Sequence, residues 1–292
     1  MTDANRRTVL VTGANSGLGK ALAIAFARDG MRVGMLVRNE ERGRAARDEI
    51  VVATGNQDIH LFVADLGSQQ EVRRAAMQIL DRFERLDVLI NNAGTAYASR
   101  RTSPEGLERS LAVNHLGPFL LTGLLLERIK TSAPARIVNV GTKMDAAMDF
   151  EDLHWTRRRY RMLQAYGQSK LGNLHFTFEL ARRLEGTGVS VNCVFPGVFR
   201  SNLGGSDGAQ GVFWKALDLL LGWALPTPTR AAERVLYAAR STDLDGVTGQ
   251  YLGDRRSLKA PAQALDADAN RRLWTISERL VGFSYNAAPS SA

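Results

Sequence analysis

The chain has 292 residues, of which 45% are hydrophobic and 23% are charged, values typical of a globular protein with a sizeable core. Its formal net charge of +8 raises the question of a nucleic-acid partner, but the basic residues are spread along the chain and accompany no nucleic-acid-binding motif, so we expect none. A single cysteine excludes an internal disulfide.

No apolar targeting segment precedes the first strand-like run, and the longest apolar stretches, at 119–126 and 217–225, are shorter than the roughly 20 residues of a membrane-spanning helix. We therefore expect a cytoplasmic protein without a transmembrane segment. The β-like run around Cys193 predicts a buried and inert thiol. The four histidines show no ligand-like spacing, so we expect no metal site.

Short β-branched runs alternate with longer amphipathic segments along most of the chain. In order, we expect strand 8–12, helix 18–29, strand 32–37, helix 40–54, strand 59–64, helix 68–83, strand 86–90, a long helix between 104 and 130, strand 136–141, helix 161–185 and strand 189–195. This alternation favours crossover connections. It predicts a single α/β domain with a doubly wound parallel sheet and helices on both faces.

No linker divides the chain, so we treat residues 1–292 as one domain with a core at about 8–255 and a C-terminal extension at about 256–292. A glycine-rich polar loop followed by an apolar helix, about 198–226, is typical of a lid. Phe213 and Trp214 in it are candidate substrate contacts. A subunit or membrane-surface contact and ordinary core packing are the alternatives.

The first strand runs into the turn TGANSGLG, whose glycines are spaced G-x-x-x-G-x-G before a helix. Glycines allow positive φ and close backbone approach, and the amide groups of the following helix N-terminus face a pyrophosphate in Rossmann-type folds. A purely structural turn is the alternative. The candidate cofactor-binding residues of this turn are Gly13, Asn15, Ser16, Gly17, Leu18 and Gly19.

The second strand is followed by Arg38, at the point where NAD-preferring dinucleotide folds carry an acidic residue. A guanidinium there binds a 2′-phosphate through paired hydrogen bonds and presents no repulsive charge. The sequence therefore predicts that the protein prefers NADP(H) over NAD(H).

Tyr166 and Lys170 stand four residues apart in an expected helix, so both side chains lie on one face and can serve one site. A tyrosine with a pKa of about 10 is a poor base at neutral pH, whereas a neighbouring ammonium favours the phenolate. We interpret the pair as a device that exchanges a proton with a substrate oxygen. A surface helix pair is the alternative.

Three motifs occur in order: T-G-x-x-x-G-x-G, the stretch Asn91-Asn92-Ala93-Gly94, and Tyr166-x-x-x-Lys170. With them the chain resembles the short-chain dehydrogenase/reductase family over residues 8–255. The stretches VNHLGPFLLT and AYGQSKLGNLHFTFEL are most similar to its retinol-dehydrogenase-like branch. The resemblance implies hydride transfer between NADP(H) and a carbonyl/alcohol pair on an apolar small molecule, and a possible homo-oligomer.

The resemblance also implies roles for further residues. Lys170 would bind the nicotinamide ribose, Thr142 would hydrogen-bond the substrate carbonyl, and Asn114 would hold a water that returns a proton to Lys170. The other implied cofactor contacts are Asp65 and Leu66 at the adenine, Asn92, Ala93 and Gly94 beside the ribose, and Pro196, Gly197 and Val198 at the nicotinamide.

The stretch at 139–142 departs from the family pattern, because it reads N-V-G-T where N-V-S-S is usual. Thr142 keeps a hydroxyl but adds a methyl group and restricts χ1. This departure leaves open a protein that binds NADP(H) as a sensor with weakened turnover, and the fold also leaves open reduction of a C=C bond. Lys143, Met144 and Met148 are candidate substrate contacts, with gap filling in the core as the alternative for the methionines.

Overall fold

The computed structural model describes residues 6–144, 146–198 and 227–285. Apart from Val198, the lid-like segment 198–226 with Phe213 and Trp214 lies outside the described residues.

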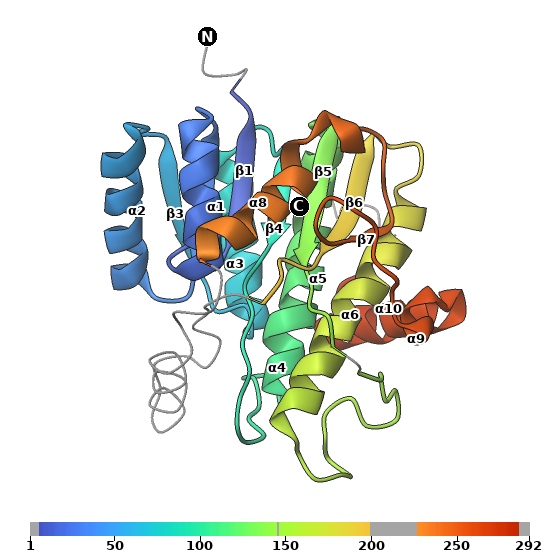
Figure 1. The fold of residues 1–292 in the computed structure, drawn as a ribbon. Coiled ribbons are helices and arrows are strands. Elements are labelled where there is room, and N and C mark those ends of the chain that lie inside the picture. Colours follow the sequence, from blue (N-terminus) through green and yellow to red (C-terminus); the bar gives the residue numbers. More distant parts are fainter. Residues whose placement is uncertain (1–5, 145, 199–226, 286–292) are drawn as a thin grey trace.

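Seven parallel strands form one twisted sheet in the order β3-β2-β1-β4-β5-β6-β7 (Figure 1). The strands are β1 (Thr8–Thr12), β2 (Arg32–Val37), β3 (Ile59–Val63), β4 (Val88–Asn91), β5 (Ala135–Val140), β6 (Val189–Val194) and β7 (Gln250–Leu252). The strand order reverses between β1 and β4. In open α/β sheets this reversal opens a crevice at the carboxyl ends of the strands, where ligands bind.

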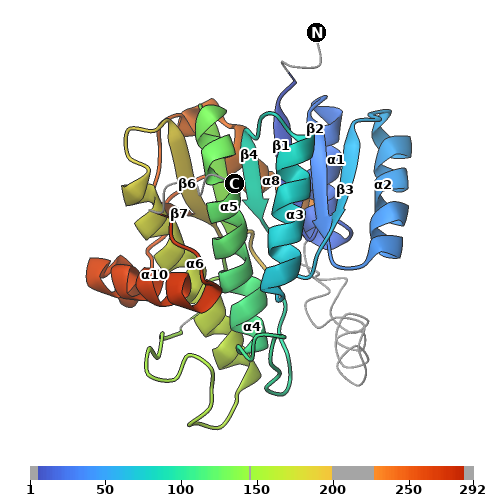
Figure 2. The same ribbon diagram turned by 180° about the vertical axis from the view of Figure 1, so that it is seen from behind.

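Helices cover both faces of the sheet, as the alternation of strands and helices predicts (Figures 1 and 2). One face carries α1 (Gly17–Arg28), α2 (Glu40–Thr54) and α8 (Pro228–Arg240). The other carries α3 (Gln69–Arg82), α5 (Gly117–Thr131) and α6 (Met162–Arg183). Along β1, Val9 and Val11 pack in the core under α1, α2 and α8, whereas Leu10 packs in the core under α3, α5 and α6. The reason is that successive side chains of a strand point to opposite faces of the sheet. The result is a single Rossmann-type α/β fold.

The expected helix between 104 and 130 begins later and is irregular. Its first turn, α4 (Arg109–Leu111), starts at Glu108, whose carboxylate accepts from the Ser110 and Leu111 amides at 2.9 and 2.7 Å. The π-helical turn η2 (Ala112–Leu116) follows, and α5 continues from Gly117. The prediction was wrong at its start because a buried glutamate caps the helix, and hydrophobic periodicity alone does not reveal the extra residue of a π turn.

The C-terminal part adds the 3₁₀ turn η4 (Thr242–Leu244), strand β7 and helices α9 (Ala262–Leu265) and α10 (Ala267–Val281). Helix α10 packs against α6 (Figure 2). Its Trp274 forms an edge contact with Phe119 of α5, with ring centroids 5.0 Å apart. None of the helices in the described part of the chain is long and apolar enough to cross a membrane.

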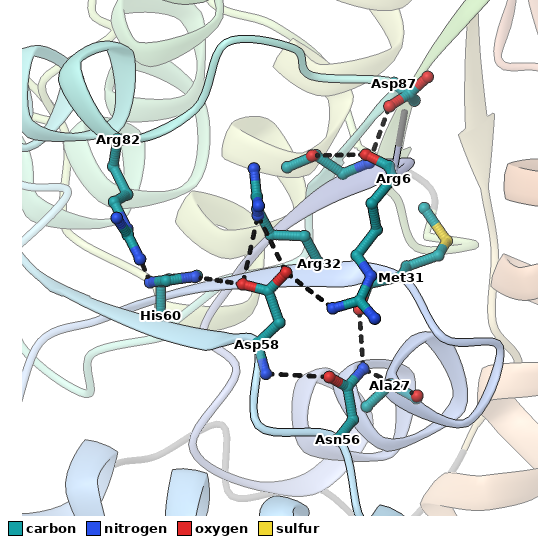
Figure 3. A network of polar contacts seen from close by, with 10 residues as sticks. Arg6, Ala27, Met31, Arg32, Asn56, Asp58, His60, Arg82 and Asp87 are labelled. Carbon is teal, nitrogen blue, oxygen red and sulfur yellow. Dashed lines mark hydrogen bonds and ion pairs between the residues drawn. The ribbon is translucent and has the colours of Figure 1, made fainter. Parts of the chain in front are cut away.

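A polar network ties the amino ends of the first strands together, at the edge of the sheet opposite the crevice (Figure 3). Asp58 accepts from Arg6 at 3.0 Å and from Arg32 at 3.1 Å. Asn56 donates to the carbonyl groups of Ala27 and Met31, at 3.0 and 2.9 Å. These contacts satisfy carbonyl groups at the end of α1 and fix the start of β3.

Candidate active site

The glycine turn connects β1 to α1 at the reversal of strand order. Gly13 and Gly17 adopt φ values of 68° and 51°, which favour glycine. Ser16 is the N-cap residue of α1, but its side chain makes no capping hydrogen bond, and the first turn contains no acidic residue. The amide groups at this helix N-terminus therefore suit an anion such as a pyrophosphate.

The end of β4 lies directly against this turn. The Thr12 hydroxyl accepts from the amides of Asn92 and Ala93, both at 3.0 Å, and Asn92 Nδ2 donates to the Thr12 carbonyl at 2.8 Å. A Cβ on Gly19 would stand 2.6 Å from Asn92 Nδ2, and one on Gly13 would stand 3.1 Å from Ala93 Cα. No side chain fits at either glycine, so the backbone forms a smooth cradle for a ligand.

Arg38 follows β2 and is exposed, with no hydrogen bond or ion pair to any other described residue. Its neighbour Asn39 caps α2 by accepting from the Arg42 amide at 2.8 Å. The guanidinium is thus available to an anionic ligand beside the crevice.

Asp65 and Leu66 follow β3 as expected, but the Asp65 carboxylate is already engaged. It forms an ion pair with Arg109 and accepts from the Gly67 amide at 2.8 Å. Leu66 is buried, at 6% exposure. The backbone of Asp65 is engaged as well, since its amide donates to Glu71 at 2.9 Å and its carbonyl accepts from the Ser68 amide at 2.9 Å.

Asn114 lies inside the π-helical turn and is completely buried. Its Oδ1 accepts from the Thr95 amide at 2.8 Å, and its Nδ2 donates to the Thr95 carbonyl at 2.8 Å and to Ser169 Oγ at 2.9 Å. The side chain therefore joins the loop after β4 to helix α6, one residue before Lys170. Single π turns within helices occur frequently at functional sites.

Tyr166, Lys170 and Thr142 meet where α6 passes the end of β5. Lys170 is 4% exposed, and its Nζ donates to the Val140 carbonyl at 3.0 Å. It also lies beside Gly94, where an added Cβ would stand 3.1 Å from Nζ. The Thr142 side chain lies close enough to the Tyr166 phenol to lower its pKa. The structure thus brings together the three residues whose chemistry the sequence links.

The pKa values of Tyr166 and Lys170 are both shifted by burial, a cause that the sequence-based expectation did not include. Burial raises the pKa of Tyr166 to about 12, and the Thr142 side chain offsets only part of this effect. Burial lowers the pKa of Lys170 to about 8. Burial thus disfavours the charged form of each group, the phenolate of Tyr166 and the ammonium of Lys170.

Two residues that the sequence did not indicate support the loop at Thr142. Tyr251 of β7 donates its hydroxyl to the Thr142 carbonyl at 3.0 Å. Gly141 packs against the completely buried Cys193. Burial raises the pKa of the Cys193 thiol to about 12, in agreement with the expected inert thiol.

A third unpredicted residue, Arg234 of α8, supports the segment after β6. It donates to the Pro196 carbonyl at 3.0 Å, and a Cβ on Gly197 would collide with its guanidinium. Gly197 has φ 91°, which favours glycine. Val198 is 68% exposed. Arg234 comes from a segment distant in sequence, and no local motif marks it.

The candidate substrate contacts separate in the structure. Lys143 is exposed, and Met144 lies half-buried near Gly167 of α6. Met148 is 3% exposed, and its backbone forms two hydrogen bonds with Gln263. Its position favours the packing alternative. Among the described residues, no three His, Cys, Asp or Glu side chains are grouped to hold a metal ion.

Comparisons with known proteins agree with this geometry. The family model for short chain dehydrogenases matches residues 7–210. Human retinol dehydrogenase 13 is 43% identical over 289 residues, covering 97% of this chain and 86% of that protein. Many other known proteins also match.

Two crystal structures share the fold. One, of a protein from Mycobacterium paratuberculosis, has a TM-score of 0.76 and 32% identity, covering 96% of this chain and 95% of that one. Another, described as a short chain dehydrogenase from Shigella flexneri 2a complexed with NADP, has a TM-score of 0.67 and 25% identity, covering 88% of this chain and 100% of that one. The protein therefore belongs to the short-chain dehydrogenase family, is similar to retinol dehydrogenases within it, and is an oxidoreductase that acts on CH–OH groups.

Proposed function

We propose that the protein is an NADP(H)-dependent reductase of apolar aldehydes or ketones. One observation carries the proposal: Tyr166 lies beside Thr142 and one helical turn before the buried Lys170, whose Nζ donates to the Val140 carbonyl at the end of β5. A protonated Tyr166 can donate a proton to a substrate oxygen, which is what carbonyl reduction requires. The same groups run the reverse oxidation when the phenol is ionised.

The residues present fit a bound NADP(H). Gly13 and Gly19 would allow the pyrophosphate to approach the backbone at the N-terminus of α1, and Arg38 would pair with the 2′-phosphate. Residues 92–94 would hold the ribose, 196–198 the nicotinamide and 65–66 the adenine. When bound, NADPH supplies the hydride for the carbonyl carbon. The Shigella relative complexed with NADP supports this choice of cofactor.

The proton follows a separate path from the hydride. Thr142 holds the carbonyl oxygen, Tyr166 donates its proton to that oxygen, and Lys170 stabilises the phenolate that remains. Asn114, tied to Ser169 beside Lys170, supports the return of a proton from solvent. General acid catalysis of this kind contributes about 10²–10⁴ in rate.

The apolar substrate class is supported by the 43% identity to human retinol dehydrogenase 13. It also agrees with the half-buried Met144 near Tyr166's helix. Cytoplasmic location and a homo-oligomer stay predictions. So does the absence of a nucleic-acid partner.

A turnover screen tests the proposal. Purified protein is mixed with NADPH or NADH and a panel of retinal, aliphatic aldehydes of increasing length, aromatic ketones and conjugated enones, and absorbance of the reduced nicotinamide is followed. We expect NADPH consumption with alcohol as product, at higher kcat/KM for longer apolar chains. NADPH binding without consumption across the panel would favour a sensor, and saturation of enones with an intact carbonyl would favour a C=C reductase.

A further inference from the structure

The residue after Asn114 in the π-helical turn is His115, and its side chain is 1% exposed. His115 Nε2 lies 2.8 Å from Ser277 Oγ, a residue 162 positions away on α10. Ser277 is also completely buried. The C-terminal helix, which lies against α6 (Figure 2), therefore forms a direct polar contact with the turn that carries a candidate catalytic residue.

The backbone bonding of the π turn departs from that of a regular α-helix. Gly117 donates its amide to the Ala112 carbonyl, five residues back. Pro118 has no N–H group, so the Asn114 carbonyl lacks the donor that a regular helix would supply four residues later. Such turns persist where the surrounding structure determines them.

Two helices from outside the turn contact the side chain of His115. Helix α6 passes close to its ring at Gly172, where an added Cβ would stand 3.0 Å from the ring Cγ. Ser277 holds the far ring nitrogen, Nε2, from the side of α10. Burial lowers the pKa of His115 to about 3, so the contact is a hydrogen bond of a neutral imidazole throughout the working pH range. The ring is thus clamped between two helices.

A shift of this turn would move Asn114 directly, since the two residues are adjacent. Asn114 in turn bonds to Ser169, the residue before Lys170, and to Thr95 in the loop after β4. We propose that the hydrogen bond between His115 and Ser277 positions the π turn, so that the C-terminal helix sets the placement of Asn114 relative to Lys170. Ser277 and His115 are positioning residues in this account, which rests on the proposed function.

A second buried hydrogen bond of α10, made to α6, offers a control. His175 of α6 bonds through Nδ1 to Asn270 Oδ1 of α10 at 2.5 Å, and both residues are buried. His175 lies in α6, outside the π turn, and no hydrogen bond joins it to a described residue of that turn. Breaking this second pair also removes a buried hydrogen bond of α10 but leaves the hydrogen bond between His115 and Ser277 in place.

The test compares Ser277→Ala with Asn270→Ala, using the panel compound that wild type turns over fastest and counting folded molecules by NADPH titration. We expect Ser277→Ala to lower kcat about tenfold to a hundredfold with KM for NADPH unchanged, as a misplaced catalytic group does. Hydrogen exchange should rise at the amides of 112–117. Asn270→Ala should keep kcat and the exchange at 112–117 near wild type.

A double variant, His115→Phe with Ser277→Ala, separates a loss of positioning from a simple loss of stability. Replacing both polar partners by apolar groups removes the unsatisfied atom and restores much of the stability. We expect the melting temperature to recover while kcat stays low. Recovery of kcat along with the melting temperature, or equal kcat for Ser277→Ala and Asn270→Ala, would overturn the positioning role. Failure of wild type to turn over any panel compound would instead overturn the proposed function and this inference with it.

Discussion

Gly141 lies directly against the buried thiol of Cys193: a Cβ added to Gly141 would stand 2.6 Å from Sγ. The two residues belong to the ends of neighbouring strands, since β5 pairs with β6 through Asn139 and Cys193. A serine, usual at this position in the family the chain resembles, has no room above the thiol. The departure at Gly141 is therefore explained by what lies beneath it.

We expect Gly141→Ser to destabilise the fold by about 1–3 kcal/mol, the usual cost of overpacking. In a Cys193→Ala background the same substitution should cost much less, because the sulfur atom is gone. Urea unfolding of the four proteins measures both values. An equal cost in the two backgrounds would show that Cys193 is not what excludes a side chain at 141.

Arg38→Asp should exchange the cofactor preference. The variant loses paired hydrogen bonds to the 2′-phosphate and gains a repulsive charge, so KM for NADPH should rise roughly 10–100-fold while KM for NADH stays or falls. Arg28→Asp, an equal charge change at the far end of α1, is the control. A parallel change of both cofactors in Arg38→Asp would argue against the phosphate contact.

The pH dependence of reduction should reflect Lys170. Its pKa is lowered by burial to about 8, so the ammonium loses its proton as pH rises through that value, whereas Tyr166, with a pKa of about 12, keeps its own. We expect kcat/KM, which reports the free enzyme, to fall above a pH of about 8. Lys170→Arg retains a cation and should move the falling limb to higher pH. If the fall in kcat/KM stays at the same pH in Lys170→Arg, the titrating group is not Lys170.

Arg234 should act on cofactor binding through the segment after β6. Arg234→Ala removes the hydrogen bond to the Pro196 carbonyl and the group that fills the space beside Gly197. We expect KM for NADPH to rise about tenfold or more, because one hydrogen bond to a charged group contributes roughly 1.5–3 kcal/mol. Arg240→Ala, at the end of the same helix, is the control. Identical cofactor kinetics in both variants would remove Arg234 from the site.

The sequence was a good guide wherever the chemistry is local. The glycine turn, the strand ends and the spacing of Tyr166 and Lys170 each depend on a few neighbouring residues. The parallel sheet follows from the alternation of strands and helices along the chain. The effect of burial on the pKa of Tyr166 could not be predicted from the sequence, because desolvation is a property of the folded pocket.

The sequence did not indicate residues whose partners are distant along the chain. Arg234, Tyr251 and Ser277 reach the site from segments 38, 109 and 162 residues away from their partners. The sequence also did not predict the π turn that contains Asn114. One inserted residue changes the pattern of apolar residues along a helix very little.

The most direct test of the account is the rate of carbonyl reduction by Tyr166→Phe beside its affinity for NADPH. The phenyl ring keeps the packing and removes only the hydroxyl that donates the proton, so we predict a loss of kcat of at least about 10² with an NADPH dissociation constant close to wild type. A Tyr166→Phe variant that reduces the same carbonyl at the wild-type rate would contradict the account.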